Sequence, residues 1–397
     1  MSGDIGSPDV LGIHPGEVEA NTPETVLNQR EQALQELSQR PDYANSTLLN
    51  KFQLQKDTRP LCSFSDIDGT YVFNSTDPLD QAKYRQATGE LTNLLAAENI
   101  GNIAVTGRDL RMVTEGQSPK TENLPQFDVI VAAVGTEIYV RQTDGTYRLD
   151  EAFKKYIEEA MGFNRQEVYA VCKAYLGKVT ASAPRLGLEF QPRDRENLLE
   201  EGVDSYEEKP YSTDTARTPQ PYKISYYFNG SEQERTAMQS GTENYLFDNG
   251  HPGLHVVISK DKQLPDGRDR YNMDIVPITK DGAINYLSTE YGSLGVVSGD
   301  SGNDIRMIQY GADVAAIPGN VNDELRQVID QLPTIRETKH FQIKQANGGS
   351  RLFYVEPDSL NGPESIKKAM RAYRLLHFLH EQKSKLPNEP LEKPTEL

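Results

Sequence analysis

The chain has 397 residues, of which 36% are hydrophobic and 25% charged, and its net charge is −17 at pH 7. This length exceeds one typical compact domain, so two domains with tails are expected. The acidic balance argues against a nucleic-acid-binding protein, which needs a basic face, and against adhesion to an anionic membrane.

The first segment, residues 1–58, is a polar N-terminal extension without a strand-like run. It has neither the basic nor the apolar region of a signal peptide. Residues 22–40 have helical spacing, with Thr22 and Pro23 at positions typical of a helix start. We expect a partly helical extension that packs on the main domain or stays mobile; a specific docking role is the alternative.

From residue 60, short apolar runs alternate with amphipathic segments. Each apolar run ends in small or turn residues, which predicts buried strands at 61–64, 102–107, 128–135, 295–300 and 313–319. Helical spacing is found at 80–100, 303–311 and 322–332. This alternation predicts a parallel sheet covered by helices on both faces. In such sheets ligands bind beyond the carboxyl ends of the strands.

The middle of the chain, residues 143–270, predicts a smaller α+β domain inserted into the parallel-sheet domain. Helices are expected at 151–163 and 165–177, and strands at 222–228 and 254–261. A loop rich in charge and proline separates the two pairs. The core domain would then comprise residues 59–142 and 271–390.

The C-terminal part contains an amphipathic helix predicted at 362–382, whose basic residues form either a solvated face or a partner site. The chain has two cysteines, Cys62 and Cys172, too few for a disulfide framework or a zinc cluster. No segment approaches the length of a membrane span. We therefore expect a cytoplasmic protein that crosses no membrane.

Two carboxylates, Asp66 and Asp68, directly follow the first predicted strand. Charges at this position need a counter-charge to stay ionised. Mg²⁺ would supply it, since it prefers carboxylate and phosphate oxygens. One carboxylate could act as nucleophile and the other as proton donor and acceptor, with Gly69 allowing a tight turn. The alternative is a turn in which an aspartate caps a helix.

Three further positions are predicted near the same edge. Thr106 ends the second strand, where a hydroxyl and a backbone N–H suit phosphate oxygens, although Thr-Gly is also a common turn. Asp300, Asn303 and Asp304 lie between a strand and a helix, where three oxygen-bearing side chains favour a metal site over a helix cap. Lys280 precedes a helix and is either a phosphate-binding cation or a surface lysine.

Together, residues 66–70, 106–108, Lys280 and 299–304 resemble, in this order, the four motifs of the haloacid dehalogenase-like phosphohydrolase superfamily. The insertion lies between the second and third motifs, as in the subfamily with a C2-type (IIB) cap. The resemblance covers roughly residues 60–335 and implies an α/β fold: a Rossmann-like core with a parallel sheet and an inserted α+β cap domain.

The resemblance also implies roles for the motif residues. Asp66 would be the nucleophile and Asp68 the general acid and base. The phosphoryl group would be bound by Thr106, Gly107, Lys280 and Asn303. A Mg²⁺ cofactor would be held by Asp66, the backbone carbonyl of Asp68, and Asp300, with Asp304 supporting the metal or its waters.

Other segments are similar to the sucrose-phosphate phosphatase branch of the superfamily, namely 127–140, 222–225, 298–307 and 317–325. By this resemblance the sugar would lie between core and cap, near Arg108, Gly135, Thr136, Glu137, Lys223 and Asn320. The N-terminal extension and the charged loop at 194–221 depart from the family pattern, and that loop could reshape the sugar pocket.

The resemblance therefore implies a Mg²⁺-dependent phosphoric monoester hydrolase that acts through an aspartyl-phosphate. A sugar phosphate, either sucrose 6-phosphate or a related glycosyl phosphate, would be its substrate. A phosphohexomutase is one alternative. A non-catalytic module bound to a sugar-phosphate synthase is another, and an active enzyme could also associate with such a synthase. The sequence leaves the oligomeric state open.

Overall fold

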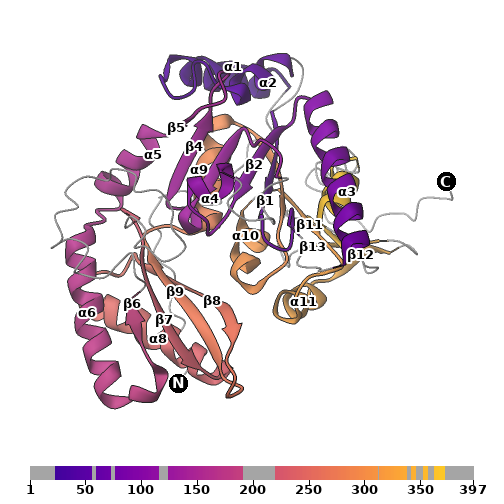
Figure 1. The fold of residues 1–397 in the computed structure, drawn as a ribbon. Coiled ribbons are helices and arrows are strands. Elements are labelled where there is room, and N and C mark those ends of the chain that lie inside the picture. Colours follow the sequence, from indigo (N-terminus) through magenta and orange to yellow (C-terminus); the bar gives the residue numbers. More distant parts are fainter. Residues whose placement is uncertain are drawn as a thin grey trace.

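The computed structural model describes residues 23–55, 60–72, 77–115, 124–190, 220–311, 313–337, 341–345, 352–355 and 362–371. Its larger sheet has ten strands in the order β12-β13-β14-β11-β10-β1-β2-β3-β4-β5 (Figure 1). The strands are β1 Leu61–Ser65, β2 Gly101–Val105, β3 Val129–Ala132, β4 Glu137–Arg141, β5 Tyr147–Leu149, β10 Leu294–Ser298, β11 Val314–Ile317, β12 Thr334–Glu337, β13 Gln342–Gln345 and β14 Leu352–Val355.

The centre of this sheet is parallel, as expected. Strands β14, β11, β10, β1, β2 and β3 pair in parallel, whereas β12, β13, β4 and β5 join in antiparallel fashion at the two edges. The five strands predicted from apolar runs correspond to β1, β2, β3, β10 and β11. Because β10 pairs with β1, the segments after these two strands emerge side by side.

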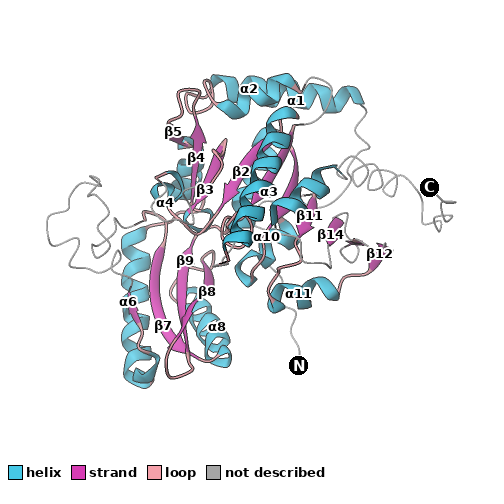
Figure 2. Cartoon of the chain, turned by 45° about the vertical axis from the view of Figure 1, so that its right-hand side comes forward, coloured by secondary structure: helices cyan, strands magenta, loops and turns pink. Residues whose placement is uncertain are grey.

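Helices cover both faces of the large sheet (Figure 2). One hydrophobic cluster joins a sheet face to α3 (Pro78–Ala97) and to the helix at 362–371. The other cluster contains residues of α9 (Lys280–Tyr291), α10 (Ile305–Tyr310) and α11 (Asp323–Asp330). The short helix α4 (Leu110–Thr114) follows β2. The mixed α/β class, with a parallel-dominated sheet, is therefore confirmed.

The smaller sheet contains β6 (Glu189–Phe190), β7 (Ile224–Gly230), β9 (Asp269–Val276) and β8 (His255–Gln263), in that order and all antiparallel. Helices α6 (Arg165–Ser182) and α8 (Glu232–Asp248) pack on one face of it (Figure 1). Helix α5 (Glu151–Lys155), continued by a π-helical turn at Tyr156–Ala160, connects β5 to this unit. The precise domain boundaries stay a prediction.

The N-terminal extension packs on the core over its described part. Helix α1 (Pro23–Gln39) buries Leu37, and helix α2 (Thr47–Leu54) buries Leu48 and Phe52, at the end of the core remote from the small sheet (Figure 1). Lys51 Nζ lies 2.7 Å from Asp128, and the hydroxyl of Tyr43 donates to Asp150 over 2.9 Å. These buried polar contacts fix the extension to the core, and residues 1–22 lie outside the described part.

The prediction that the basic residues of the C-terminal helix form a solvated face is wrong for Lys367. This lysine is buried and pairs with Glu90 of α3 and with Glu364. The helix lies against the sheet face that α3 covers, so Lys367 reaches a carboxylate instead of water. Arg371 is exposed, and Arg374 lies outside the described residues.

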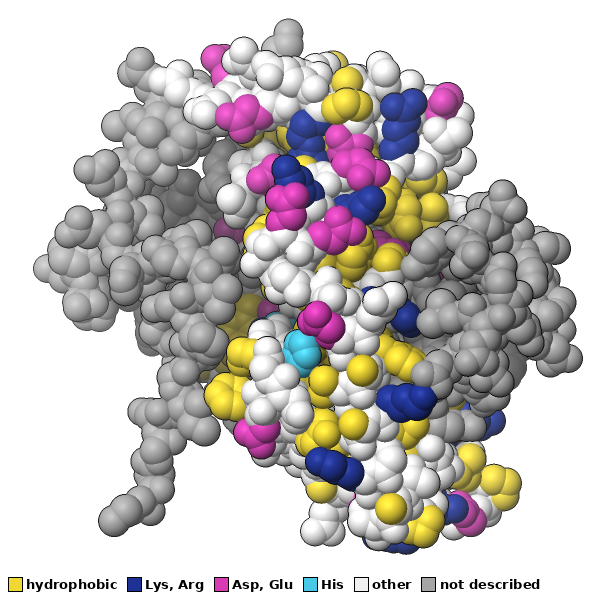
Figure 3. Space-filling model, turned by 90° about the vertical axis from the view of Figure 1, so that its left-hand side faces the viewer, with side chains coloured by type: hydrophobic (Ala, Val, Ile, Leu, Met, Phe, Trp, Pro, Cys, Tyr) yellow, Lys and Arg dark blue, Asp and Glu magenta, His cyan; other side chains and the backbone are white. Residues whose placement is uncertain are grey.

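No described helix combines the length and apolar character that crossing a membrane requires. On the face drawn in Figure 3, Lys and Arg side chains alternate with Asp and Glu side chains. The described side chains on that face therefore form no continuous basic surface.

Candidate active site

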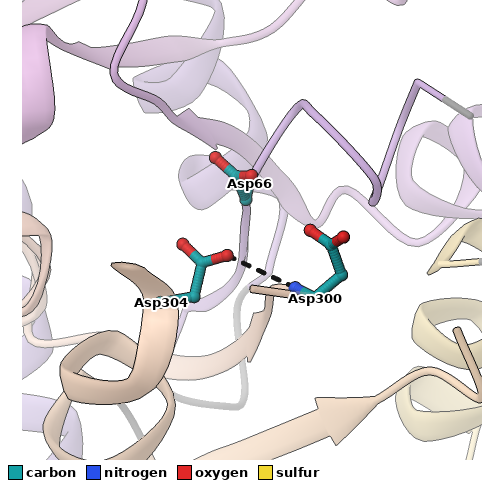
Figure 4. Close-up of side chains that lie close together, drawn as sticks. All are labelled: Asp66, Asp300 and Asp304. Carbon is teal, nitrogen blue, oxygen red and sulfur yellow. Dashed lines mark hydrogen bonds between the residues drawn. The ribbon is translucent and has the colours of Figure 1, made fainter. Parts of the chain in front are cut away.

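Three carboxylates meet at the carboxyl edge of the large sheet (Figure 4). Asp66 is the first residue after β1, and its backbone N–H donates to the carbonyl oxygen of Ser298, the last residue of β10. Asp300 and Asp304 follow β10, with Asp304 in the short helix η5 (Gly302–Asp304). One oxygen from each of the three carboxylates lies within 4.8 Å of the others. Strand pairing therefore creates the cluster predicted from the sequence.

Lys280 reaches into this cluster from the first position of α9. Its Nζ lies 2.8 Å from Asp66 Oδ1 and 2.7 Å from Asp304 Oδ1. All three side chains are buried, so these contacts are weakly screened by water. The two carboxylates raise the pKa of Lys280 more than burial lowers it, which keeps the ammonium charged.

Among the described residues, one paired cation, Lys280, faces the three carboxyl groups of this cluster. Burial, together with the neighbouring Asp304 and Asp300, raises the pKa of Asp66 well above the usual value, although Lys280 opposes this shift. Burial and Asp304 likewise raise the pKa of Asp300 to about 7. Protons therefore compete with any cation for these oxygens.

Asp304 is fixed by its own loop. Its Oδ2 accepts from the backbone N–H groups of Asp300 and Ser301, each over 3.3 Å (Figure 4). A Cβ at Gly299 would lie 2.6 Å from the Asp304 side chain, so a larger residue there would displace it. By contrast, Asp300 Oδ1 is buried and has no hydrogen-bond partner among the described residues. An oxygen left in this state suits a hard divalent cation, and the donor set is entirely carboxylate.

Gly69 brings the turn after β1 against Asp300. Its φ of +76° lies in the region that favours glycine, and a Cβ there would lie 1.9 Å from Asp300 Oδ2. Asn320 supports the same turn, because its Nδ2 donates to the Gly69 carbonyl oxygen over 2.9 Å. The glycine is therefore needed for close approach as well as for backbone conformation.

Asp68 is turned away from the acidic cluster. Its side chain is 48% exposed and pairs with Arg108 through two hydrogen bonds, of 2.8 and 2.6 Å. Both residues line the cavity described below. The Asp68 carboxylate thus lies at the cavity and outside the group formed by Asp66, Asp300 and Asp304.

The other predicted phosphate-binding residues are Thr106, Gly107 and Asn303. Thr106 directly follows β2 and is buried, and its Oγ1 accepts from the Arg108 backbone N–H over 3.2 Å. Gly107 lines the cavity, as does Asn303, whose Oδ1 accepts a hydrogen bond from the Ser301 hydroxyl.

A cavity of about 760 Å³ lies between the carboxyl edge of the large sheet and one face of the small sheet. The core side contributes Asp66, Asp68, Arg108, Lys280 and Asp300 among others. The small sheet contributes a set that the sequence analysis did not identify, including Tyr227 of β7, Ser259 of β8, and Asn272 and Asp274 of β9. The available sequence signal was the spacing of the two polar residues of β9, because residues two positions apart in a strand lie on the same face of the sheet.

The expected sugar-binding residues occupy other positions. Gly135, Thr136, Glu137, Lys223 and Asn320 do not line the described cavity. Gly135 lies against the start of α9, where a Cβ would lie 2.8 Å from the Lys280 backbone nitrogen. Lys223 is buried behind the cavity wall, 3.4 Å from Asp274. Arg108 is the member of this group that faces the cavity.

Residues 60–182 match the family model of the sucrose-6F-phosphate phosphohydrolases. This match covers less than half of the chain, and over these residues the chain is similar to that family. The expected enzyme class, a phosphoric monoester hydrolase, is that of the matched family. No curated protein matches this chain.

The fold resembles that of a solved sucrose-phosphatase. The sucrose-phosphatase of Synechocystis sp. PCC6803 was solved with sucrose and phosphate, and it is 22% identical to the present chain. The TM-score is 0.50, and the match covers 80% of the present chain and 99% of the Synechocystis chain. A haloacid dehalogenase-like hydrolase of Bacillus subtilis is 19% identical, with a TM-score of 0.40 and coverage of 72% and 94%. A trehalose-6-phosphate phosphatase of Aspergillus fumigatus is 12% identical, with a TM-score of 0.40 and coverage of 84% and 96%.

Proposed function

We propose that the protein is a Mg²⁺-dependent sugar-phosphate phosphatase that works through an aspartyl-phosphate on Asp66. Its substrate would be sucrose 6-phosphate or a related glycosyl phosphate. The observation that carries the proposal is the position of Asp66, which faces a cavity while its carboxylate is held by Lys280 and flanked by Asp300. A buried, anchored carboxylate of this kind is placed to attack phosphorus in line with the leaving oxygen.

The reaction would proceed in two displacements. In the first, an Asp66 oxygen forms a bond to phosphorus, the bond to the sugar oxygen breaks, and Asp68 donates the proton that the leaving oxygen takes up. In the second, Asp68 accepts a proton from water, whose oxygen attacks phosphorus and releases phosphate from Asp66. The Asp68–Arg108 contact would loosen in each step, and Arg108 could turn toward the phosphoryl oxygens.

A divalent cation would be held by Asp66, Asp300 and Asp304. Asp300 Oδ1 is buried and has no hydrogen-bond partner among the described residues, which supports such an ion. The raised pKa values of Asp66 and Asp300 support it as well, because the ion would stabilise their charged forms. When bound, Mg²⁺ supplies charge neutralisation around the transferring phosphoryl group.

The substrate class is supported by the cavity and by the family. A volume of about 760 Å³ falls in the range of small-molecule sites and exceeds what a phosphate alone needs. The small sheet presents hydroxyl, amide and carboxylate groups, which suit sugar hydroxyls. The matching family is defined by sucrose-6F-phosphate, and the Synechocystis relative was solved with sucrose and phosphate. A cytoplasmic location and an association with a cognate synthase stay predictions.

The direct test is phosphate release from a panel of sugar phosphates with Mg²⁺ present. The panel contains sucrose 6-phosphate, trehalose 6-phosphate, glucosylglycerol phosphate and glucosyl-phosphoglycerate. We expect one disaccharide or glycosyl phosphate to exceed p-nitrophenyl phosphate in kcat/KM. Isomerised hexose phosphate without free phosphate would indicate a mutase instead, and absence of turnover across the panel would contradict an enzymatic role.

Mg²⁺ binding is expected to strengthen as pH rises. Because the pKa of Asp300 lies at about 7, its proton must leave before the carboxylate can bind the ion. Affinity should therefore fall about tenfold per pH unit between pH 7 and 5 for this one proton. Without metal, the protonated Asp300 carboxyl stabilises the folded protein at low pH, because its pKa is higher in the folded chain than in the unfolded chain. This stabilisation is lost as pH rises from the pKa of the unfolded chain toward 7. Titration calorimetry and thermal unfolding at pH 5 and 8 measure both effects.

Asp300→Asn provides the control for this pH dependence. The amide cannot titrate, so the affinity for Mg²⁺ should be weak and its dependence on pH less steep. An equally steep dependence in the variant would show that Asp300 is not the competing group.

A further inference from the structure

An ion pair joins the small domain to the core at the cavity wall. Arg235 lies in the first turns of α8, and its Nη2 is 3.3 Å from Glu324 Oε1 in the first turn of α11. Helix α8 packs on the small sheet, whereas α11 packs with the large-sheet domain (Figures 1 and 2). Both residues line the cavity, so their contact crosses from one wall to the other.

On the small-domain side, Arg235 is held in place. Its guanidinium lies 2.5 Å from Glu232 Oε1, one helical turn earlier, and its side chain is only 19% exposed. The second oxygen of Glu232 accepts from the hydroxyl of Tyr271, a residue of β9, over 3.3 Å. Contacts within the small domain therefore fix the Arg235 side chain before it meets the core.

On the core side, Glu324 lies directly over the loop of the acidic cluster. A Cβ at Gly302 would lie 2.0 Å from Glu324 Oε2, so a larger residue there would displace this carboxylate. Gly302 begins η5, the segment that carries Asp304. Strand β8 of the small domain also packs against η5. Glu324 thus contacts both the small domain and the segment that holds the cluster.

We propose that Arg235 and Glu324 form a clasp that holds the small domain closed over the cavity and couples closure to the position of residues 300–304. This inference rests on the proposed function, because closure over a cavity matters only when a substrate occupies it. Arg235 is therefore a positioning residue. It lies in the cavity wall and acts on residues 300–304 through its contact with Glu324. Breaking it would shift the population of open molecules without changing the groups that react.

Single-molecule energy transfer measures closure without turnover. Dyes are attached to Phe247→Cys on α8 and Leu79→Cys on α3, two positions that are 65% and 70% exposed. The protein that carries only these two cysteine substitutions is the background. It is compared with Arg235→Gln, Glu324→Gln and the double variant, each made in that background. Because partly exposed pairs are weak, each single change should raise the ratio of open to closed molecules about two- to fivefold. The double variant should match a single one, since both remove the same contact.

Arg185→Gln is the control, since Arg185 pairs with Glu234 inside the small domain and spans no gap. It should leave the ratio unchanged. Salt should open the background protein but have little effect on the clasp variants. No shift in Arg235→Gln, or fully additive shifts in the double variant, would overturn the clasp. Hydrolysis of p-nitrophenyl phosphate tests the proposed function separately, so failure of one proposal is distinguishable from failure of the other.

Discussion

Asp66→Asn is expected to abolish phosphate release, with a fall in kcat on the order of 10⁴- to 10⁶-fold, the scale seen when a nucleophile is removed. The amide cannot form an aspartyl-phosphate, and Lys280 then retains Asp304 as its buried partner. The fold should survive at pH 8, because the variant removes a carboxylate whose ionisation is opposed by burial and by Asp304. Phosphate release and thermal unfolding of the metal-free protein measure the two effects.

Asp128→Asn is the matched control. Asp128 is also a buried aspartate paired with a lysine, and it precedes β3 at the opposite end of the sheet, under the N-terminal extension. It does not line the cavity. This variant should lose stability, by about 1–3 kcal/mol for a weakened charged contact, and keep its activity. Substantial activity in Asp66→Asn would contradict an aspartyl-phosphate mechanism.

Lys280→Met is expected to remove both activity and stability. The ammonium contacts Asp66 and Asp304 at 2.8 and 2.7 Å, so its loss leaves buried carboxylates without their cation. Breaking a buried pair in this way costs about 3–5 kcal/mol. Lys280 lowers the pKa of Asp66 and Asp300, so its removal raises those values and makes the loss larger at pH 8 than at pH 5. Urea unfolding at the two pH values gives the difference.

Mg²⁺ should restore part of the stability of Lys280→Met, because the ion would bind the same carboxylates. Lys367→Met is the comparison, since Lys367 also pairs with two carboxylates but Glu90 and Glu364 are partly exposed. Its unfolding should show a smaller loss and no response to Mg²⁺. Equal losses in the two lysine variants would indicate that Lys280 serves packing alone.

The central strands and the acidic cluster were predictable because they depend on strong local signals. The apolar runs of β1 and β10 each end in aspartates, and parallel pairing brings such ends together. Strands β12 and β13 gave no such signal. They form a polar antiparallel edge, in which Thr334–Glu337 is exposed throughout. An edge strand need not carry an apolar run, so periodicity misses it.

Contacts between distant segments were not predictable from local pattern. The pairing of Asp68 with Arg108 depends on where β1 and β2 end relative to each other. To predict which small-sheet residues line the cavity, one must know which face of β9 meets it. The alternation of side chains along a strand defines two faces but does not say which of them is buried. Gly135 lies near the site as expected, yet it packs behind Lys280 instead of lining the cavity.

The order of strands in the large sheet bears on how the chain acquires its native structure. Strand β1 lies between β2, which follows it closely in sequence, and β10, which pairs Phe64 with Val297. The Lys280–Asp66 contact spans 214 residues. During synthesis the first strand must therefore wait until the whole small domain has emerged before its second neighbour exists. Such non-local pairing slows folding, and the strand edge that is exposed meanwhile makes the partly synthesised chain prone to aggregation.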